Sequence, residues 1–248
     1  MDRLIYTAMT GARHILEQQA TTANNLANAT STGFRAQLNA FRAVPVVAEN
    51  LPLATRAFVV DSTVGTNFAP GPMLQTGREL DVAVQNKGWI AVQSADGSEA
   101  YTRNGALRVN ENGMLQTQSG LMVQGETGPL AVPPEVRLAI AGDGTLGAVS
   151  TSTAPGPATI LGRIKLVNPP EQSLVRGDDG LFRLRDGGPA EADPAVRLSA
   201  GALEGSNVSP VDSMVSMIAL ARSFETQMSM LKNAENNAAK ATQILALN

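Results

Sequence analysis

The sequence predicts an α+β fold in which long helices at the amino and carboxyl ends form a coiled-coil domain, with a central all-β, antiparallel domain between them in the chain. Three observations predict it. Apolar residues follow a heptad pattern through residues 214–245, a weaker heptad pattern covers residues 5–29, and turn signals containing glycine recur about every eight residues between 87 and 120. The middle of the chain therefore has the residue pattern of short strands and turns, whereas both ends have the apolar spacing of helices.

The carboxyl-terminal helix is predicted from one continuous stripe. Ser209 precedes it as a predicted N-cap, and Pro210 suits the first helical turn, where a missing N–H costs little. No Gly or Pro follows Pro210, so the helix should be about 50 Å long. A narrow stripe of that length requires a partner along the whole helix. Eight of its ten positions are apolar in the series Met214, Met217, Ala221, Phe224, Met228, Leu231, Glu235, Ala238, Thr242 and Leu245.

The amino-terminal helix is predicted from the same spacing, with Asp2 as its cap. Small and polar residues weaken its stripe, which runs through Ile5, Ala8, Ala12, Ile15, Gln19, Thr22, Leu26 and Ala29. The helix is predicted to end near Ala29, because residues 30–33 form a stop signal that ends in glycine. The residues that follow are predicted to add a short helix or an arm, so that residues 1–44 belong to the coiled-coil core. Residues 45–75 hold four prolines and no sustained period, which indicates an extended connector.

The central domain is predicted over residues 76–203 as an antiparallel meander. Residues 147–157 are rich in Ser, Thr and Pro, which indicates a surface loop. Residues 204–248 then form the carboxyl-terminal helix of the coiled-coil core. Strands are predicted at 80–84, 89–93, 100–103, 106–110, 114–118, 121–124, 136–140, 160–167 and 181–185.

The composition excludes several classes of partner and chemistry. A net charge of −3 over 248 residues gives no reason to expect nucleic acid or an anionic membrane as a partner. No cysteine is present to form disulfides, thiolate nucleophiles or Cys-ligated metal sites. No segment approaches the ~20 apolar residues of a membrane helix, so we expect no membrane insertion. Polar residues and a glycine dilute residues 4–12, so we expect an uncleaved amino terminus rather than a signal peptide.

No motif argues for catalysis, a cofactor or a bound metal. Residues 142–147 fit the dinucleotide-binding pattern G-x-G-x-x-G, but no helix is predicted after them, so we interpret them as a Gly-rich β-turn. Residues 176–178 match a receptor-binding tripeptide, which we interpret as part of an ordinary turn. His14 is the only histidine and lies off the main stripe, so neither a His-based metal site nor a Ser–His pair is expected. The chain is therefore not expected to be an enzyme.

Three blocks of the sequence resemble the bacterial flagellar basal-body rod protein family. Residues 23–35 (ANNLANATSTGFR) resemble the amino-terminal signature of its rod and hook members. Residues 76–89 and 101–105 are similar to its β-domain block, and residues 206–225 to its carboxyl-terminal signature. The blocks span nearly the whole chain in the order found in the family, which makes the combination specific. The opening residues 1–9 and the segment 34–38 look most like the proximal-rod member.

The resemblance implies an axial structural protein of bacterial motility. Such a subunit is exported through the flagellar type III apparatus without a cleaved signal peptide, reaches the periplasm and joins the basal-body rod. Its terminal helices pack into a helical tube that transmits torque from the motor to the hook. The implied partners are other proximal and distal rod subunits, further copies of the chain, the export apparatus and the rod cap.

The resemblance and the heptad stripes together predict the residues of an assembly interface. Asn24, Asn25 and Asn28 allow two interpretations, either solvated surface residues or amides that pair across subunits and fix the register of a packed tube. The resemblance favours the second. The predicted interface comprises Ile5, Ala12, Ile15, Asn24, Asn25, Leu26, Asn28, Gly33 and Phe34, together with Val211, Met214, Met217, Ile218, Arg222, Phe224, Met228 and Leu231.

Other functions are compatible with some of the same patterns. A distal-rod sibling shares the signatures, and a secreted coiled-coil adhesin or effector shares the terminal heptads. If the chain is an adhesin, it should form a discrete oligomer in solution. If it is a rod subunit, it should be a monomer whose ends become ordered on assembly. An enzyme on the β domain would require a pocket with convergent polar groups, and the sequence shows no such set.

Overall fold

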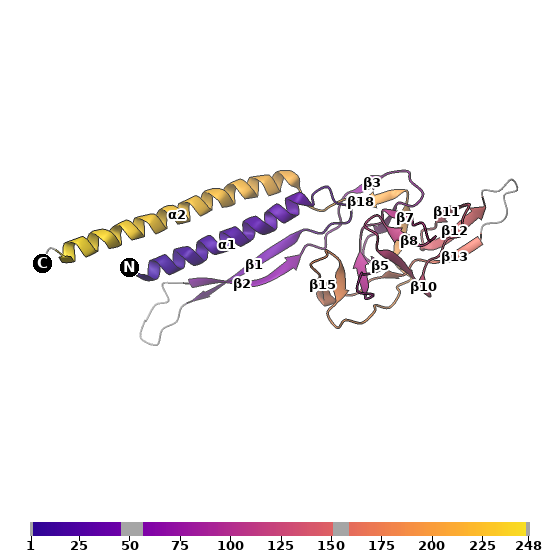
Figure 1. Ribbon diagram of the computed structural model, residues 1–248, viewed down its shortest axis with the longest axis horizontal. Helices are drawn as coiled ribbons and strands as arrows, with labels where there is room; N and C mark the ends of the chain where they lie inside the picture. The colour runs from indigo at the N-terminus through magenta and orange to yellow at the C-terminus, as the bar shows by residue number, and fades with distance from the viewer. Residues whose placement is uncertain (1, 46–56, 151–158, 247–248) are drawn as a thin grey trace. The chain divides into compact units, whose positions relative to one another are not determined.

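The computed structural model describes residues 2–45, 57–150 and 159–246, and the chain divides into two compact units (Figure 1). The helix–hairpin unit comprises residues 1–29, 36–67 and 208–248. The β unit comprises residues 30–35 and 68–207. The chain therefore passes between the units four times, at 29/30, 35/36, 67/68 and 207/208.

Two helices and a β-hairpin make up the described part of the helix–hairpin unit. Helix α1 (Asp2–Ala27) and helix α2 (Pro210–Ala246) lie side by side and antiparallel (Figure 1). Strands β1 (Gln37–Pro45) and β2 (Ala57–Thr66) pair antiparallel, with a register shift after Ala40. Helix α2 begins as predicted, with Pro210 as its first residue. The Ser209 hydroxyl accepts a hydrogen bond from the Asp212 N–H at 3.3 Å.

Polar side chains of α1 bind the hairpin. The Asn25 amide pairs with the Gln37 backbone in both directions, since its Nδ2 donates to the carbonyl at 2.9 Å and its Oδ1 accepts from the N–H at 2.8 Å. One helical turn earlier, the Thr21 hydroxyl donates to Asn39 Oδ1 at 3.1 Å. Gln37 and Asn39 are two residues apart, so they share one face of β1, and this face lies against α1.

The predicted fold class is wrong in its terminal domain. The described residues contain two α-helices, and these do not form a coiled-coil domain of long terminal helices. The chain leaves α1 at Ala27 and returns along it as the hairpin, which covers the side of the helix that carries His14, Thr21 and Asn25. The His14 ring meets Phe41 of β1 edge-on, with 5.4 Å between ring centroids. The fold is α+β, with a helix–hairpin unit in place of the coiled coil and with the antiparallel β domain that the sequence predicts.

Part of the predicted connector carries strands. Strands β2 and β3 (Met73–Gln75) lie within residues 45–75, and residues 46–56 of that segment fall outside the described chain. The prediction of a surface loop at 147–157 is wrong for residues 147–150, which belong to β12 (Thr145–Ser150), and its residues 151–157 lie outside the described chain.

The β unit consists of short antiparallel strands. The largest sheet has the order β15-β16-β6-β5-β9-β8-β7, with β10 paired to β9 and β14 to β5. Smaller groups are β11-β12-β13, β17-β4 and β18-β3. A 3₁₀ turn (Glu171–Ser173) precedes β15. The remaining bounds are β4 (Val82–Gln85), β5 (Trp89–Gln93), β6 (Glu99–Thr102), β7 (Leu107–Val109), β8 (Leu115–Thr117), β9 (Met122–Gly125), β10 (Gly128–Pro129), β11 (Val136–Ile140), β13 (Thr159–Arg163), β14 (Leu166–Val167), β15 (Leu174–Arg176), β16 (Phe182–Leu184), β17 (Arg197–Ala200) and β18 (Ala202–Glu204).

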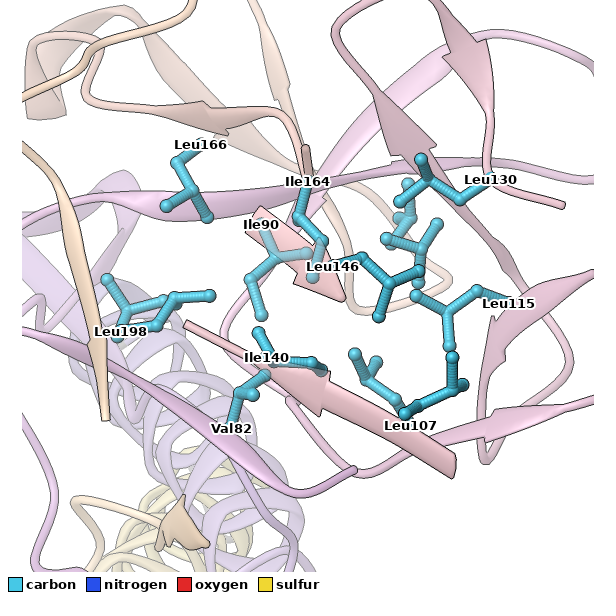
Figure 2. Close-up of a cluster of buried hydrophobic side chains, with 14 of the residues drawn as sticks. Val82, Ile90, Leu107, Leu115, Leu130, Ile140, Leu146, Ile164, Leu166 and Leu198 are labelled. Carbon is cyan, nitrogen blue, oxygen red and sulfur yellow. The ribbon is translucent and has the colours of Figure 1, made fainter. Parts of the chain in front are cut away.

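Strand β5 is buried on both faces, which explains its continuous apolar run. Ile90 and Val92 join the main core, where side chains from many strands gather around Leu146 (Figure 2). Trp89 and Ala91 point to the opposite face and join a second cluster. There the Trp89 ring packs on Phe182, with 4.6 Å between centroids. Burial of four consecutive side chains fixes β5 as the central strand of the unit.

Tyr101 should make the stability of the β unit fall at high pH. Its ring is fully buried, and its hydroxyl donates to Glu99 Oε1 at 3.0 Å and accepts from the Ala190 N–H at 2.7 Å. Burial raises the pKa of Tyr101 from 10.0 to about 12, with a smaller contribution from Glu99. Because the folded pKa exceeds the unfolded one, the stabilisation is complete below pH 10 and is lost as the pH rises towards 12.

The test compares wild type with Tyr101→Phe in urea unfolding. The variant should be less stable by about 1 kcal/mol at pH 8, because it leaves the Ala190 N–H without its partner. The difference in unfolding free energy should shrink between pH 10 and 12. In this range the Tyr101 hydroxyl ionises when the wild type unfolds, which lowers the stability of the wild type and not that of the variant. A difference that is constant across this range would contradict the assignment.

Candidate assembly interface

One side of α2 faces α1. The α2 side chains that are partly buried recur every three or four residues. On α1, Ala8 and Ala12 are buried, and Gly11 lies beside the Gln227 side chain. The small residues of α1 thus allow the two helices to approach closely. The partly buried positions of α2 are Ser213, Met217, Leu220, Phe224, Gln227, Leu231 and Ala234.

A second apolar side of α2 is exposed at the start of the helix. Val211, Met214, Val215 and Ile218 leave 69%, 53%, 62% and 57% of their surface exposed. Positions i, i+3, i+4 and i+7 lie on one face of a helix, so the four side chains form one continuous strip. We call this strip the α2 apolar face. No described residue covers it, and side chains of this kind are normally buried.

Helix α1 also has an exposed side. Tyr6, Met9 and Leu16 are exposed there. They continue into small exposed residues at Ala20 and Ala23. Arg13 lies on the same side between Met9 and Leu16, so the apolar and small residues are interrupted there by one exposed cation.

The structure places the predicted interface residues in three environments. Val211, Met214, Ile218, Arg222, Met228 and Asn24 are exposed. Met217, Phe224, Leu231, Ala12, Ile15 and Leu26 are buried or partly buried. Ile5 lies in α1, and its side chain is outside the described set.

The asparagines predicted for the interface have partners within the chain. Both amide atoms of Asn25 bind Gln37. The Asn28 Nδ2 donates to the Asn24 carbonyl at 2.9 Å. Of the three, only Asn24 has an exposed side chain. Pairing of these amides across subunits therefore stays a prediction.

Gly33 and Phe34 belong to the β unit. Gly33 has a φ of +70°, and its N–H donates to the Glu204 carbonyl at 2.7 Å. A side chain at this position would overlap the backbone of Arg103, so only glycine fits. The Phe34 ring lies under the Arg176 guanidinium, at 4.5 Å from its carbon to the ring centroid. Both residues are thus fixed in the β unit by neighbours from distant parts of the sequence.

Arg222 is exposed one turn after Ile218 and so borders the α2 apolar face, whereas a carboxylate of α1 is paired within its own helix. Glu17 of α1 accepts from Arg13 Nε at 3.0 Å and lies 3.2 Å from His14 Nδ1. The hydrogen bond from Arg13 lowers the pKa of Glu17 below its ordinary value. This carboxylate is therefore ionised at neutral pH and already has a cationic neighbour, Arg13, within its own helix.

The remaining sequence motifs are turns. Residues 142–147 lead into strand β12 rather than into a helix, and the Gly144 N–H donates to the Ala141 carbonyl at 2.9 Å. The interpretation as a β-turn is therefore confirmed. Within the described ranges, no group of three or more His, Asp or Glu side chains is placed to hold a metal ion. Neither described helix combines the length and apolar character needed to cross a membrane.

Three family descriptions match separate parts of the chain. Residues 5–35 match the flagella basal body rod protein family, and residues 83–148 match the flagellar hook protein FlgE/F/G D1 domain. Residues 199–244 match the flagellar basal body rod FlgEFG protein C-terminal domain. The first and last matches include the residues of both helices that contact each other.

Full-length relatives agree with these matches. The chain is 50% identical to the flagellar basal-body rod protein FlgF of Escherichia coli strain K12 and 49% identical to that of Salmonella typhimurium strain LT2, with 100% of each chain covered in both alignments. It is 29% identical to the flagellar basal-body rod protein FlgG of Borreliella burgdorferi, over 95% of this chain and 96% of the relative.

Proposed function

The chain belongs to the family of flagellar basal-body rod proteins, and from this membership we propose that the exposed sides of α1 and α2 bind neighbouring rod subunits. The family consists of structural proteins, so the chain is a structural subunit of the basal-body rod and not an enzyme. Its similarity is greater to FlgF than to FlgG, which supports a FlgF-like proximal-rod protein. The distal-rod sibling and the secreted adhesin or effector are not favoured.

The α2 apolar face is the observation that carries this proposal. Removing about half of the surface of a Val, Met or Ile side chain from water contributes about 1 kcal/mol. The four side chains together therefore provide about 4 kcal/mol for each contact with a neighbour. A face that meets a different surface on the next copy gives an interface that does not close on itself, and repetition of it builds a helical tube. Such a tube transmits torque from the motor to the hook.

The predicted interface residues take two roles in this proposal. The buried and partly buried ones hold α1 and α2 together and so keep the exposed sides in place. The exposed ones, Val211, Met214, Ile218, Arg222, Met228 and Asn24, contact the neighbouring subunit directly.

The route to the basal body is a finer part of the proposal. It consists of export through the flagellar type III apparatus, addition to the rod beneath its cap, and no cleavage of a signal peptide. Mass spectrometry of the chain taken from basal bodies should find the peptide that contains Arg3 and Leu4 intact. A mature chain that begins further along the sequence would contradict this route.

The test of the proposed function is the content of purified basal bodies. Hook–basal bodies washed in high salt should contain the untagged chain in a fixed ratio to the other rod proteins, because apolar contacts are not weakened by salt. A strain that lacks the chain should neither build filaments nor swim. Absence of the chain from washed basal bodies would overturn the proposal.

A further inference from the structure

The segments by which the chain enters and leaves the β unit are bonded to one another inside that unit. These crossing segments are residues 30–35, 68–71 and 204–207. The Asn207 Nδ2 donates to the Ala69 carbonyl at 2.8 Å, and the Asn207 N–H donates to the Phe34 carbonyl at 3.4 Å. Each crossing segment is therefore tied to at least one other, although they are distant in sequence.

Glu204 lies at the centre of these contacts and is 1% exposed. Its Oε1 accepts from Arg35 Nη2 at 2.6 Å and from the Gly71 N–H at 2.9 Å. Its Oε2 accepts from Arg103 Nη1 at 2.9 Å. One carboxylate thus joins the first crossing segment, the second crossing segment and the body of the β unit.

Arg35 is held from a second direction. Arg176 Nη1 donates to the Arg35 carbonyl at 2.7 Å, while the Arg176 guanidinium covers the ring of Phe34. Arg103 is held by the Val84 carbonyl at 3.1 Å in addition to Glu204. Glu204, Arg35 and Arg103 form a buried ion cluster, which is therefore connected to β4 and β15 as well as to the crossing segments.

The cluster is not the arrangement that stability alone would favour. Two arginines share one carboxylate, and Arg35 Nε, Arg35 Nη1 and Arg103 Nε have no hydrogen-bond partner among the described residues. Buried ion pairs often contribute less stability than apolar side chains of the same volume. The Glu204 ion pairs are therefore weak evidence of a stabilising role.

We propose that Glu204 and Arg35 form a clamp through which the β unit takes up mechanical load from all of its crossing segments together. Without it, a pull on residues 30–35 would be resisted mainly by single hydrogen bonds, such as those from Asn207 to Phe34 and from Arg176 to Arg35. With it, the ion pair, the Gly71 bond and the Gly33 bond must break together. The inference rests on the proposed rod function and deepens it, because a subunit that transmits torque carries load along its own chain.

The test uses Arg35→Met, which leaves Glu204 and Arg103 as a balanced pair, so the β unit should still fold. Met is unbranched and apolar, and so adds no polar group to the buried site. Hydrogen exchange at the Gly33 and Gly71 amides should accelerate about 30-fold or more, while the core Ala91 amide stays protected. Lys165→Met is the matched control, because it removes the cation from the Glu99 ion pair elsewhere in the same unit and should not affect Gly33 or Gly71.

The second measurement is swimming at high load. Cells with Arg35→Met should incorporate the chain into basal bodies at the normal ratio and swim at normal speed in dilute medium, but lose at least half of their speed in viscous medium. Unchanged exchange at Gly33 would overturn the clamp. Normal swimming in viscous medium, or failure of the variant to enter basal bodies, would overturn its mechanical role. Absence of the wild-type chain from basal bodies would instead refute the proposed function and leave the exchange result standing.

Discussion

Replacing Gly105 by alanine should unfold the β unit. A Cβ at this position would overlap the carbonyl oxygen of Val82, a residue with no exposed surface in the main core. The same two residues are joined by a hydrogen bond from the Val82 N–H to the Gly105 carbonyl at 3.0 Å, so neither backbone can move alone. Relief of the overlap requires β4 to leave the core, and we expect a loss of about 4 kcal/mol or more.

The matched control is Gly188→Ala. Gly188 has no atom within 4 Å of the position that a Cβ would take, and its φ lies outside the left-handed region. Its replacement should change the unfolding free energy by no more than about 0.5 kcal/mol. Trp89 fluorescence during urea unfolding reports on both variants, since this ring lies in the β unit. A Gly105→Ala protein with the midpoint of the wild type would contradict the packing described for this turn.

The strands of the β unit could be predicted because local signals agree with the tertiary environment. Trp89–Gln93 reads as a strand and is one, since its apolar run lies between two cores and its ends carry turn residues. Short strands such as β17 and β18 carry weaker signals. They exist because β17 pairs with β4 and β18 with β3, more than a hundred residues earlier in the chain. Nothing within either segment indicates that pairing.

The hairpin was missed because the usual polarity is reversed at the start of β1. On β1, Leu38 and Arg42 point outward, whereas Gln37 and Asn39 face α1 and are bonded to it. With Gln37 and Asn39 on the covered face and Leu38 on the exposed one, the start of β1 gives no usable alternation, although Phe41 further along the covered face packs on His14. On α1, Thr21 and Asn25 bind the hairpin, and neither belongs to the apolar stripe from which the helix was predicted.

The interface was predicted only in part for a similar reason. Met217, Phe224 and Leu231 face α1, but the same series includes Met214 and Met228, which are exposed. The side that contacts α1 includes Ser213 and Gln227, polar residues that an apolar pattern passes over. Val215 was missed although it lies four residues after Val211 on the exposed face. The clamp could not be predicted at all, because Arg35 and Glu204 are 169 residues apart.

Ile218→Asp should prevent incorporation of the chain into the rod. Ile218 lies in the α2 apolar face, so its replacement puts a charge where the proposal requires contact with a neighbour. Placing an unpaired carboxylate in such a contact costs at least about 3 kcal/mol, which corresponds to a loss of roughly 100-fold in affinity. The residue is 57% exposed in the single chain, so the variant should fold and melt like the wild type.

Ser216→Asp provides the comparison, because it introduces the same charge two residues away on the same helix, at an exposed position off the apolar face. Cells with this variant should swim, and their basal bodies should hold the chain at the normal ratio. Cells with Ile218→Asp should not spread in soft agar, and their basal bodies should lack the chain although it is present in the cell. Equal swimming by the two strains would show that the α2 apolar face is not where rod subunits meet. Loss of swimming in both would mean that α2 tolerates no added negative charge, and the effect could then not be assigned to this face.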